Sequence, residues 1–441
     1  MLLVSGLSAS AAEAPSQAMV VKISGSPQAI LVPGGSPVTL KVGDALPPGA
    51  EIKTGPGSEV YFSPVGGAVT AVSQNSDITI QELSSDTDTT GVVKKQKVRL
   101  KLDSGVAVAT LDPDKKNVND YEISTPKGIA AARGTNFSAS VTAADGTIIT
   151  ANADSVSFTQ NGVTVVISQG QVSYTPIGGI TTTVALTSVA AQSNPAIANA
   201  ISSGVTAMAS VLSGNLGSLS ADSAANLAAK VTASACAAIP TQAASLTSQM
   251  VTAVAASPVL SGQASSNVIA AVITGASVAA PTQVAAIAAA AVSGLSTSAA
   301  TSGATAAATT NAVAAVVTTA VSVDPGEASA ISTAVTNATP SQATNVVVGL
   351  NNAASSGAIT QTQASTAVTA TAASSGGQSV QALNNQAAAA QSSSTSPSAA
   401  VISTSQGNAA TNGGATAGSG ATGVVAPPIP PTTTNQPASP N

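Results

Sequence analysis

The large side chains of this protein are confined to its first part, and this segregation limits what the remainder can fold into. All six aromatic residues lie before residue 175, and the chain has no Trp. Charge follows the same division, because among 13 Lys and Arg only Lys230 comes after Arg133. Large side chains supply most of the burial energy of a core. We therefore expect a conventional domain up to residue 182, followed by an Ala-, Ser-, Thr- and Val-rich remainder.

The composition argues against several classes of function. The formal net charge is −5, whereas nucleic-acid-binding proteins neutralise phosphates with clustered Lys and Arg. The chain has no His, which excludes His-based triads and metal sites. The single Cys236 lies among alanines, where we expect a small buried residue on a helix. We predict no enzyme, no cofactor, no metal and no nucleic-acid partner.

Three short motifs imitate functional sites, but their context is wrong. Residues 124–127 fit S-x-x-K, yet a proline interrupts the helix that such a pair needs. Residues 86–91 begin like a calcium loop, but Lys97 stands where a bidentate Glu is required. Asp112 and Asp114 could be paired carboxylates, but no apolar pocket or aromatic platform accompanies them. An exposed polar loop is the simpler interpretation.

The N-terminus is typical of the back half of a secretory signal peptide. A short apolar run leads to two A-x-A patterns, at residues 9–11 and 12–14. The basic segment that normally comes first is missing, so we interpret residues 1–14 as a truncated signal peptide. This predicts export to the periplasm or cell surface. The most apolar later stretch, 284–292, is shorter than the roughly 20 residues of a membrane span, so we expect no transmembrane span.

Residues 15–182 show a pattern of strands and turns. Alternating runs such as 28–32, 38–42 and 59–62 are separated by Gly and Pro clusters. Asn161-Gly162 lies between two such runs and is the strongest hairpin signal, because a type I′ turn favours Asn-Gly. The basic run 94–101 is typical of a strand with one solvated face. Many short strands predict a β-sandwich or a β-solenoid-like domain.

Two blocks within this region resemble signatures of the FecR family. Residues 43–60 read G-x-x-L-x-x-G and then I-x-T-G-x-x-S-x-V, and residues 125–137 contain T-P followed by R-G-T-x-F. Gly170-Gln171 stands where the family closes its last strand. The resemblance covers roughly residues 20–180, with a departure near residue 154 that we interpret as a turn variant. It implies the FecR periplasmic fold and contacts with other envelope components, with no catalytic activity.

The signature residues are expected mainly to shape the fold. Pro126 ends strand pairing and keeps the residue before it extended. Gly134 permits a close approach that a side chain would block. Phe137 is expected to point into the core. Arg133 is the one signature residue for which a binding role is an alternative to a structural one, because its guanidinium could pair with a carboxylate or bind loop carbonyls. The complete set is Thr54, Gly55, Thr125, Pro126, Arg133, Gly134, Thr135 and Phe137.

Residues 183–391 have helical rather than strand periodicity. A Pro-x-Gln/Glu motif recurs at residues 240, 281, 325 and 340, with weaker copies at 262 and 362. Pro suits the first helical position, and Asp324 and Thr339 are expected to supply N-cap side chains. Apolar residues at +1, +4 and +8 from each Gln or Glu form one stripe. Two alternatives stay open, a stack of short Ala-rich helices and a fluctuating spacer.

Residues 392–441 are low-complexity and Pro-rich at their end, which predicts a disordered terminus. Taken together, the patterns indicate an exported, envelope-located FecR-like module that acts as a scaffold or binding domain for an envelope protein or surface polymer. A signal-relay component resembling a sigma-factor regulator is one alternative. A surface adhesin or matrix protein whose tail self-associates is the other.

Overall fold

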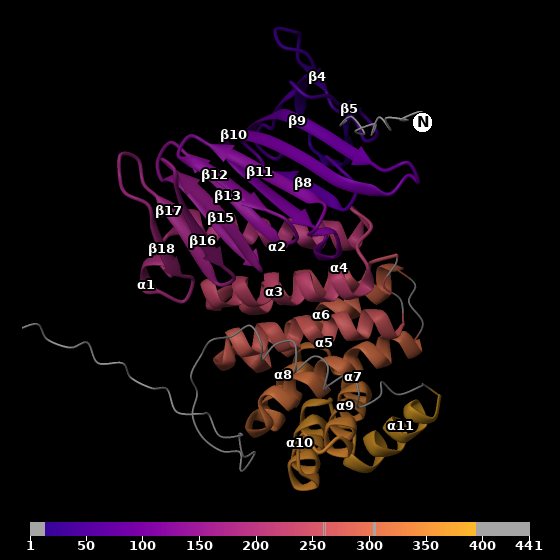
Figure 1. The fold of residues 1–441 in the computed structure, drawn as a ribbon. Coiled ribbons are helices and arrows are strands. Elements are labelled where there is room, and N and C mark those ends of the chain that lie inside the picture. Colours follow the sequence, from indigo (N-terminus) through magenta and orange to yellow (C-terminus); the bar gives the residue numbers. More distant parts are fainter. Residues whose placement is uncertain (1–13, 259, 261, 303–305, 394–441) are drawn as a thin grey trace, which may run out of the picture.

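The computed structural model describes residues 14–258, 260, 262–302 and 306–393. The signal-peptide and disordered-terminus predictions therefore fall almost wholly outside the described residues. Within them, a β-rich part is followed by a helical part, as Figure 1 shows. This confirms the predicted fold class for the described chain.

The β-rich part consists of two sheets, which we call sheet A and sheet B. Apart from the parallel pair β10–β11, the paired strands in both sheets are antiparallel. Sheet A runs, in spatial order, β4 (Val38–Thr39), β3 (Gln28–Ile30), β6 (Glu51–Lys53), β9 (Asp77–Thr87), β10 (Val93–Leu111), β11 (Asn119–Thr125), β12 (Gly128–Ala132), β15 (Ser155–Gln160) and β16 (Val163–Ser168), with β1 (Ala14–Pro15) also on β9. Sheet B runs β5 (Ala45–Leu46), β2 (Ala18–Ser24), β7 (Glu59–Ser63), β8 (Ala68–Val72), β10, β13 (Asn136–Thr142), β14 (Gly146–Ala153), β17 (Gln171–Thr175) and β18 (Thr182–Ala185).

Strand β10 belongs to both sheets. Its first part pairs with β9 and β11 in sheet A, and its last part pairs with β8 and β13 in sheet B. The strand changes sheet at Gly105, which has a φ of +89° and would place a Cβ only 2.4 Å from the Cα of Ser76. Only glycine fits both the conformation and the space. The crossing therefore depends on this residue.

The two sheets pack face to face around one core, so the domain is a β-sandwich rather than a solenoid. Phe62, Phe137 and Ile149 enter the core from sheet B, and Tyr121 and Phe158 enter it from sheet A. The predicted hairpin is confirmed, since Asn161 (φ +50°) and Gly162 (φ +78°) join β15 to β16. The basic run is also a strand with one solvated face, because its lysines lie outside while its apolar residues are buried.

The helical part consists of helices that follow one another along the chain. Four of these helices are preceded by a 3₁₀ turn at the Pro-x-Gln/Glu motif. One more 3₁₀ turn, Pro113–Lys115, belongs to the β-rich part and lies between β10 and β11. The α-helices are α1 (Val189–Gln192), α2 (Pro195–Ser213), α3 (Ala221–Ala238), α4 (Ala243–Ala255), α5 (Gln263–Ala279), α6 (Val284–Ser302), α7 (Ala306–Val323), α8 (Ala328–Ala338), α9 (Ala343–Ser355), α10 (Gln361–Ser374) and α11 (Val380–Ser393). Helices α2, α3, α5, α6 and α7 are longer than the expected short helices, at 17–19 residues.

From α2 onward, helices two positions apart in the chain pack more extensively on each other than consecutive helices do, which produces two columns (Figure 1). A single apolar core runs through both columns, from Ile148 of sheet B to Ala387 of α11. Glycines mark the closest crossings. A Cβ at Gly275 of α5 would lie 2.7 Å from a carbonyl oxygen of α3, and one at Gly349 of α9 would lie 2.8 Å from a carbonyl oxygen of α7. Small residues thus supply the close packing that large apolar side chains supply elsewhere.

The predicted apolar stripe is confirmed in four helices, because every +1, +4 and +8 residue is buried. These residues are Ala243, Leu246, Met250, Val284, Ile287, Ala291, Ala328, Ile331, Val335, Ala343, Val346 and Leu350.

The prediction that Asp324 and Thr339 cap helices with their side chains is wrong. Neither side chain accepts a capping hydrogen bond. A 3₁₀ turn occupies the motif instead, and backbone amides bond to the carbonyls of these two residues. A complete capping box occurs at Thr360 and Gln363, in one of the weaker motif copies.

The helical part is attached to the outer face of sheet B. Helix α2 packs across β10, β13 and β14, and α3 packs on β14. Strands β13 and β14 are therefore buried on both faces. Sheet A lies on the far side of the sandwich, away from the helices (Figure 1). Sheet B continues past residue 182, where β18 pairs with β17.

Two of the described helices are long and apolar enough, by length and composition alone, to cross a membrane. They are Pro195–Ser213 and Pro281–Ala299. The expectation that the stretch around residues 284–292 is too short for a span was therefore too strict, because it is part of a 19-residue apolar helix. In this fold both segments pack against other elements, the first on sheet B and the second between α4 and α8.

Candidate functional site

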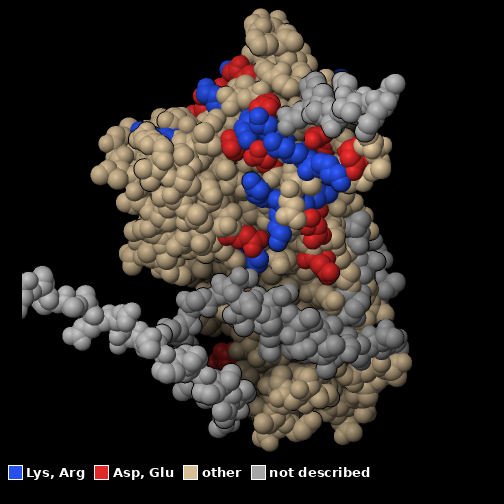
Figure 2. All heavy atoms as spheres, in the orientation of Figure 1, with Lys and Arg blue, Asp and Glu red and all other residues tan. Residues whose placement is uncertain are grey.

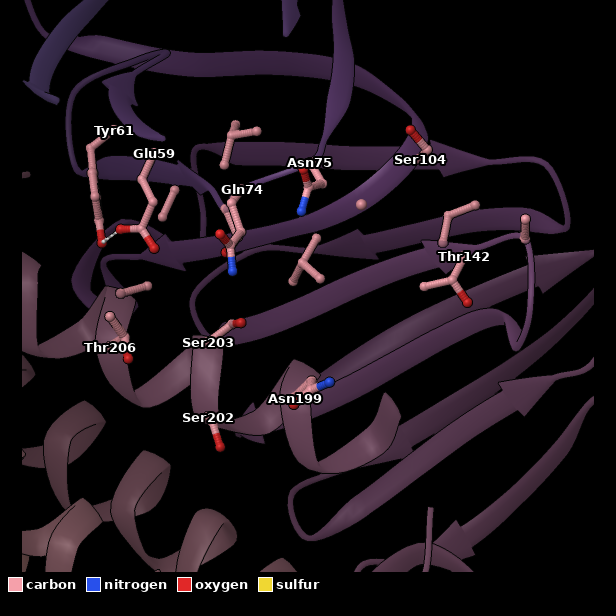
Figure 3. Close-up of a pocket in the computed structure, with 18 residues that line it drawn as sticks. Glu59, Tyr61, Gln74, Asn75, Ser104, Thr142, Asn199, Ser202, Ser203 and Thr206 are labelled. Carbon is pink, nitrogen blue, oxygen red and sulfur yellow. Dashed lines mark hydrogen bonds between the residues drawn. The ribbon is translucent and has the colours of Figure 1, made fainter. Parts of the chain in front are cut away.

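A groove of about 620 Å³ lies between the outer face of sheet B and helix α2 (Figure 3). One wall is formed by α2, through Asn199, Ser202, Ser203 and Thr206. These residues recur at intervals of three and four along one side of the helix. The opposite wall is formed by the turn 73–75 after β8 and by the bend of β10 at residues 104–105. Strand β7 bounds one end, and the β13–β14 turn bounds the other.

The groove has polar walls and an apolar floor. Three carboxamides line it, from Gln74, Asn75 and Asn199, together with several Ser and Thr hydroxyls. Each of these groups can donate and accept hydrogen bonds. The floor consists of small aliphatic residues of sheet B, Ala71, Val72, Val106 and Val141, with Ala207 of α2 beside them; Val106 is half-buried and the others are buried.

Glu59 is the charged residue among those that line the groove. The Tyr61 hydroxyl lies beside it and donates to Glu59 Oε2 at 3.4 Å. The Tyr61 ring is 2% exposed, and Lys22 Nζ lies 5.1 Å from its centroid. Burial raises the pKa of the Tyr61 hydroxyl to about 12. At neutral pH this end of the groove therefore holds a protonated Tyr61 hydroxyl that is already bonded to Glu59, and Glu59 is the acidic side chain there.

The first FecR-like block supports one wall of the groove. Thr54 is buried, its hydroxyl donates to the Ser73 carbonyl oxygen at 2.6 Å, and it accepts from the Ser76 amide at 2.9 Å. The Gly55 carbonyl accepts from the Asn75 amide at 3.4 Å. Both residues therefore hold the 73–76 turn from below without entering the groove. They act as positioning residues for Gln74 and Asn75.

The Thr125-Pro126 pair lies elsewhere, in the hairpin between β11 and β12. The Thr125 hydroxyl donates to the Gly128 carbonyl at 2.9 Å and accepts from the Gly128 amide at 3.2 Å. Thr125 and Gly128 also pair across the hairpin, so Pro126 occupies a tight turn. These two residues close a turn of sheet A, on the far side of the sandwich from the groove.

The R-G-T-x-F block runs from a surface loop into the core. A Cβ at Gly134 would lie 2.9 Å from the Pro113 Cα, so the predicted close approach is confirmed. Thr135 is buried and donates to the Ala153 carbonyl. Phe137 is fully buried, as predicted, and meets the Tyr121 ring edge-on with centroids 6.1 Å apart.

Arg133 does not join the other signature residues in a site. Its side chain is exposed, and within the described part of the chain it forms no ion pair. Its carbonyl oxygen accepts from Asn119 Nδ2 at 3.1 Å. The signature residues are therefore spread over three places, and only Thr54 and Gly55 lie next to the groove.

A buried polar network beneath α2 and α3 was not predicted from the sequence. Asn152 Nδ2 donates to Asn136 Oδ1 at 2.8 Å and to Ser138 Oγ at 2.9 Å, and Asn152 Oδ1 accepts from Thr150. The Ser234 hydroxyl of α3 donates to the Asn152 carbonyl at 2.8 Å. A Cβ at Gly204 of α2 would lie 2.4 Å from Asn152 Nδ2. The network thus fixes how closely both helices approach the sheet.

Charged residues also fasten the helices to the sandwich. Lys230, the one basic residue beyond Arg133, forms a salt bridge with Asp154. Asp154 has a φ of +56°, which agrees with the turn variant expected there. The expected exposed position is found for Asp114 but not for Asp112. Asp112 is 5% exposed, and both carboxylates accept from Ser223 in the first turn of α3, at 3.1 and 3.0 Å. A helix N-terminus favours such acidic partners.

The remaining charges gather over β9, β10 and β11 of sheet A (Figure 2). They are largely paired, as in Arg99 with Asp120 and Glu122 at 2.9 and 2.8 Å, and Lys97 with Glu82 at 2.8 Å. Exposed pairs of this kind contribute little stability each. The helical part shows almost no charge in the same view. Among the described residues, no group of three or more His, Cys, Asp and Glu is arranged to hold a metal ion.

Sequence patterns could not reveal the groove, because its walls come from five separate elements between Glu59 and Ala207. The only local signal was the spacing of Asn199, Ser203 and Thr206, which places polar residues on one side of an otherwise apolar helix. The signature blocks pointed instead to residues that organise the sandwich.

One known protein family matches a segment of the β-rich part. Residues 50–173 match the family model described as FecR protein, which covers less than a third of the chain. No curated protein matches the chain. FecR proteins are regulatory and associated with the cell envelope. The β-sandwich of this chain therefore carries a FecR domain, at residues 50–173.

Proposed function

We propose that this protein is an exported, non-catalytic binding scaffold of the cell envelope, with the groove between sheet B and α2 as its recognition site. The observation that carries the proposal is that the FecR domain and the helical part build the groove together. A FecR domain without α2 would lack one wall. In this proposal, residues 15–182 form the FecR-like β domain, and residues 183–391 form the helical region that completes the site.

The chemistry of the groove supports binding rather than catalysis. Its lining offers carboxamides, hydroxyls and a single carboxylate, and the chain has no His to act as a general base beside a hydroxyl. Cys236 lies in the core of α3, fully buried, and burial raises the pKa of its thiol to about 11. Hydrogen-bonding groups above an apolar floor are typical of a site that recognises a ligand without changing it.

The continuous core of the helical part supports a scaffold role. It extends from sheet B to α11 without interruption among the described residues, so the groove is attached to a long packed arm. Stacked repeats of this kind behave as extended, quasi-one-dimensional bodies. Self-association of residues 183–441 remains a prediction, which concentration-dependent sedimentation of that fragment would test.

Site-specific photocrosslinking in the full chain tests the proposal. A benzophenone amino acid replaces Ser203, which points into the groove in Figure 3, and a matched variant carries it at Ser213, near the end of α2 and outside the groove. After irradiation of envelope fractions, we expect a discrete adduct at position 203 and none at position 213. Equal labelling at both positions, or none at either, would contradict a recognition site in the groove.

Signal relay is a second candidate function, which the FecR match favours. Helix α2 contacts both sheet B and α4, so a ligand that displaces α2 would disturb the stack. Hydrogen exchange of α4 and α6 in the presence of the crosslinked partner tests this. Faster or slower exchange there would support relay, whereas a change confined to α2 would favour a passive scaffold.

A further inference from the structure

The groove lacks the groups that recognise anions. Phosphate and carboxylate ligands are bound mainly by Arg and Lys. No Arg or Lys is among the residues that line the groove, and the one charged member is Glu59. Lys22, which lies nearby, is directed to the Tyr61 ring and donates to Ser210 Oγ at 2.9 Å. An acidic ligand would therefore meet a carboxylate without a compensating cation.

The groove also lacks a free strand edge. Extended peptides are commonly bound by adding a strand to an exposed edge, where main-chain hydrogen bonds provide the affinity. The strands that line the groove are β7, β8, β10 and β13, and each is paired on both sides within sheet B. A peptide lying here would find side chains only.

What the groove offers is an apolar floor between rows of neutral donors and acceptors. A sugar ring has the matching character, because its C–H faces are apolar while hydroxyls that donate and accept surround its rim. Carboxamides and hydroxyls pair with such hydroxyls in both directions. The volume of about 620 Å³ lies within the range of roughly 300–1,000 Å³ that is usual for small-ligand sites.

We propose that the groove binds a neutral, hydroxyl-rich oligosaccharide. The apolar faces of the sugar rings lie on the floor that includes Ala71 and Val106, and the sugar hydroxyls bond to the walls formed by α2 and the 73–75 turn. Glu59 makes the site selective, because it repels sugars that carry carboxylates or sulfates. This inference rests on the proposed function, since it names the ligand class of the same groove.

The test uses the purified full chain and defined trisaccharides. Maltotriose, mannotriose, tri-N-acetylchitotriose and α-1,4-galactotriose serve as neutral probes. Trigalacturonate is the matched acidic probe for galactotriose, and a neutral Ser/Asn/Gly hexapeptide is the peptide probe. Binding is measured by saturation-transfer NMR and isothermal calorimetry. Ser203→Trp fills the groove, and Ser213→Trp is the control on the same helix.

We expect at least one neutral trisaccharide to bind the wild type and the Ser213→Trp variant, and to lose binding to Ser203→Trp. Trigalacturonate should bind more weakly than galactotriose, and Glu59→Gln should narrow that difference by about two- to fivefold. If Ser203→Trp does not fold, Asn199→Ala serves instead. Asn199 is exposed, and loss of its carboxamide should weaken binding by about three- to tenfold.

Four results would overturn the inference: no neutral trisaccharide binds, trigalacturonate binds as tightly as galactotriose, the hexapeptide alone binds, or neither groove variant weakens sugar binding. The photocrosslinking result separates the two proposals. A specific adduct at position 203 without sugar binding would leave the groove as a recognition site and remove only the carbohydrate assignment.

Discussion

The substitution Gly204→Ala tests how the helical part is seated on the FecR domain. On a solvated helix, replacing Gly by Ala stabilises by up to about 1 kcal/mol, because Ala loses less backbone entropy on folding. Here the new Cβ would lie 2.4 Å from Asn152 Nδ2 and 3.3 Å from Ser138 Oγ. Either α2 moves outward, or the Asn152 side chain gives up its bonds to Asn136 and Ser138.

The expected net effect is destabilising. Two lost hydrogen bonds cost about 1–3 kcal/mol together, and overpacking a well-filled site costs a similar amount. After the helix-propensity gain is subtracted, we expect Gly204→Ala to lower the free energy of unfolding by about 0.5–2 kcal/mol. Urea denaturation followed by far-UV circular dichroism measures this change.

Ser202→Ala is the matched control, because it lies on the same helix and its side chain makes no hydrogen bond within the described residues. It should be neutral or stabilise by a few tenths of a kcal/mol. If Gly204→Ala were as stable as the wild type or more so, the close seating of α2 on Asn152 would be refuted. The groove would then lose its fixed second wall.

Three further predictions concern the stack, the boundary and the thiol. Ile287→Asp places a carboxylate at a fully buried position of α6, so the helical circular dichroism signal should fall by more than the contribution of one helix. Ala286→Asp, on the exposed side of α6, should change the signal little, and an unchanged Ile287→Asp spectrum would contradict the stack. The fragment 14–186, which keeps β18, should melt broadly because it exposes the outer face of sheet B, whereas 14–238 retains α2 and α3 and should melt cooperatively. Equally sharp melts would argue that the helices are dispensable. The Cys236 thiol, with its pKa raised by burial from 9.0 to about 11, should react with Ellman's reagent at pH 8 only on unfolding. Because the folded pKa is the higher one, the stability contributed by the buried neutral thiol is fully present below pH 9, and the free energy of unfolding should fall by about 2 kcal/mol as pH rises from 9 to 11. A stability that is flat over this range in comparison with Cys236→Ala would contradict the burial.

Much of the local structure could be predicted from the sequence. The Asn161-Gly162 turn, the solvated basic strand and the stripe through Ile287 and Ile331 all depend on near neighbours in the chain, so their patterns are visible without the fold. The capping prediction at Asp324 and Thr339 failed because a Pro-x-Gln/Glu segment can begin a helix or form a 3₁₀ turn before it, and the local pattern does not distinguish the two.

The groove and the buried network required the tertiary structure. Alternation along β13 indicates that Ser138 and Phe137 point to opposite faces, but it does not indicate what covers the second face. The sequence by itself determined a strand-rich, FecR-like front part, helical periodicity in the remainder and the absence of His chemistry, while it left sandwich or solenoid, and packed stack or spacer, open. Only the tertiary structure decided that α2 lies across sheet B, so that Ser138 is buried while Ser203 faces a groove. The physical reason is that periodicity records how a residue is oriented within its own element, whereas burial and binding depend on which distant element packs against it.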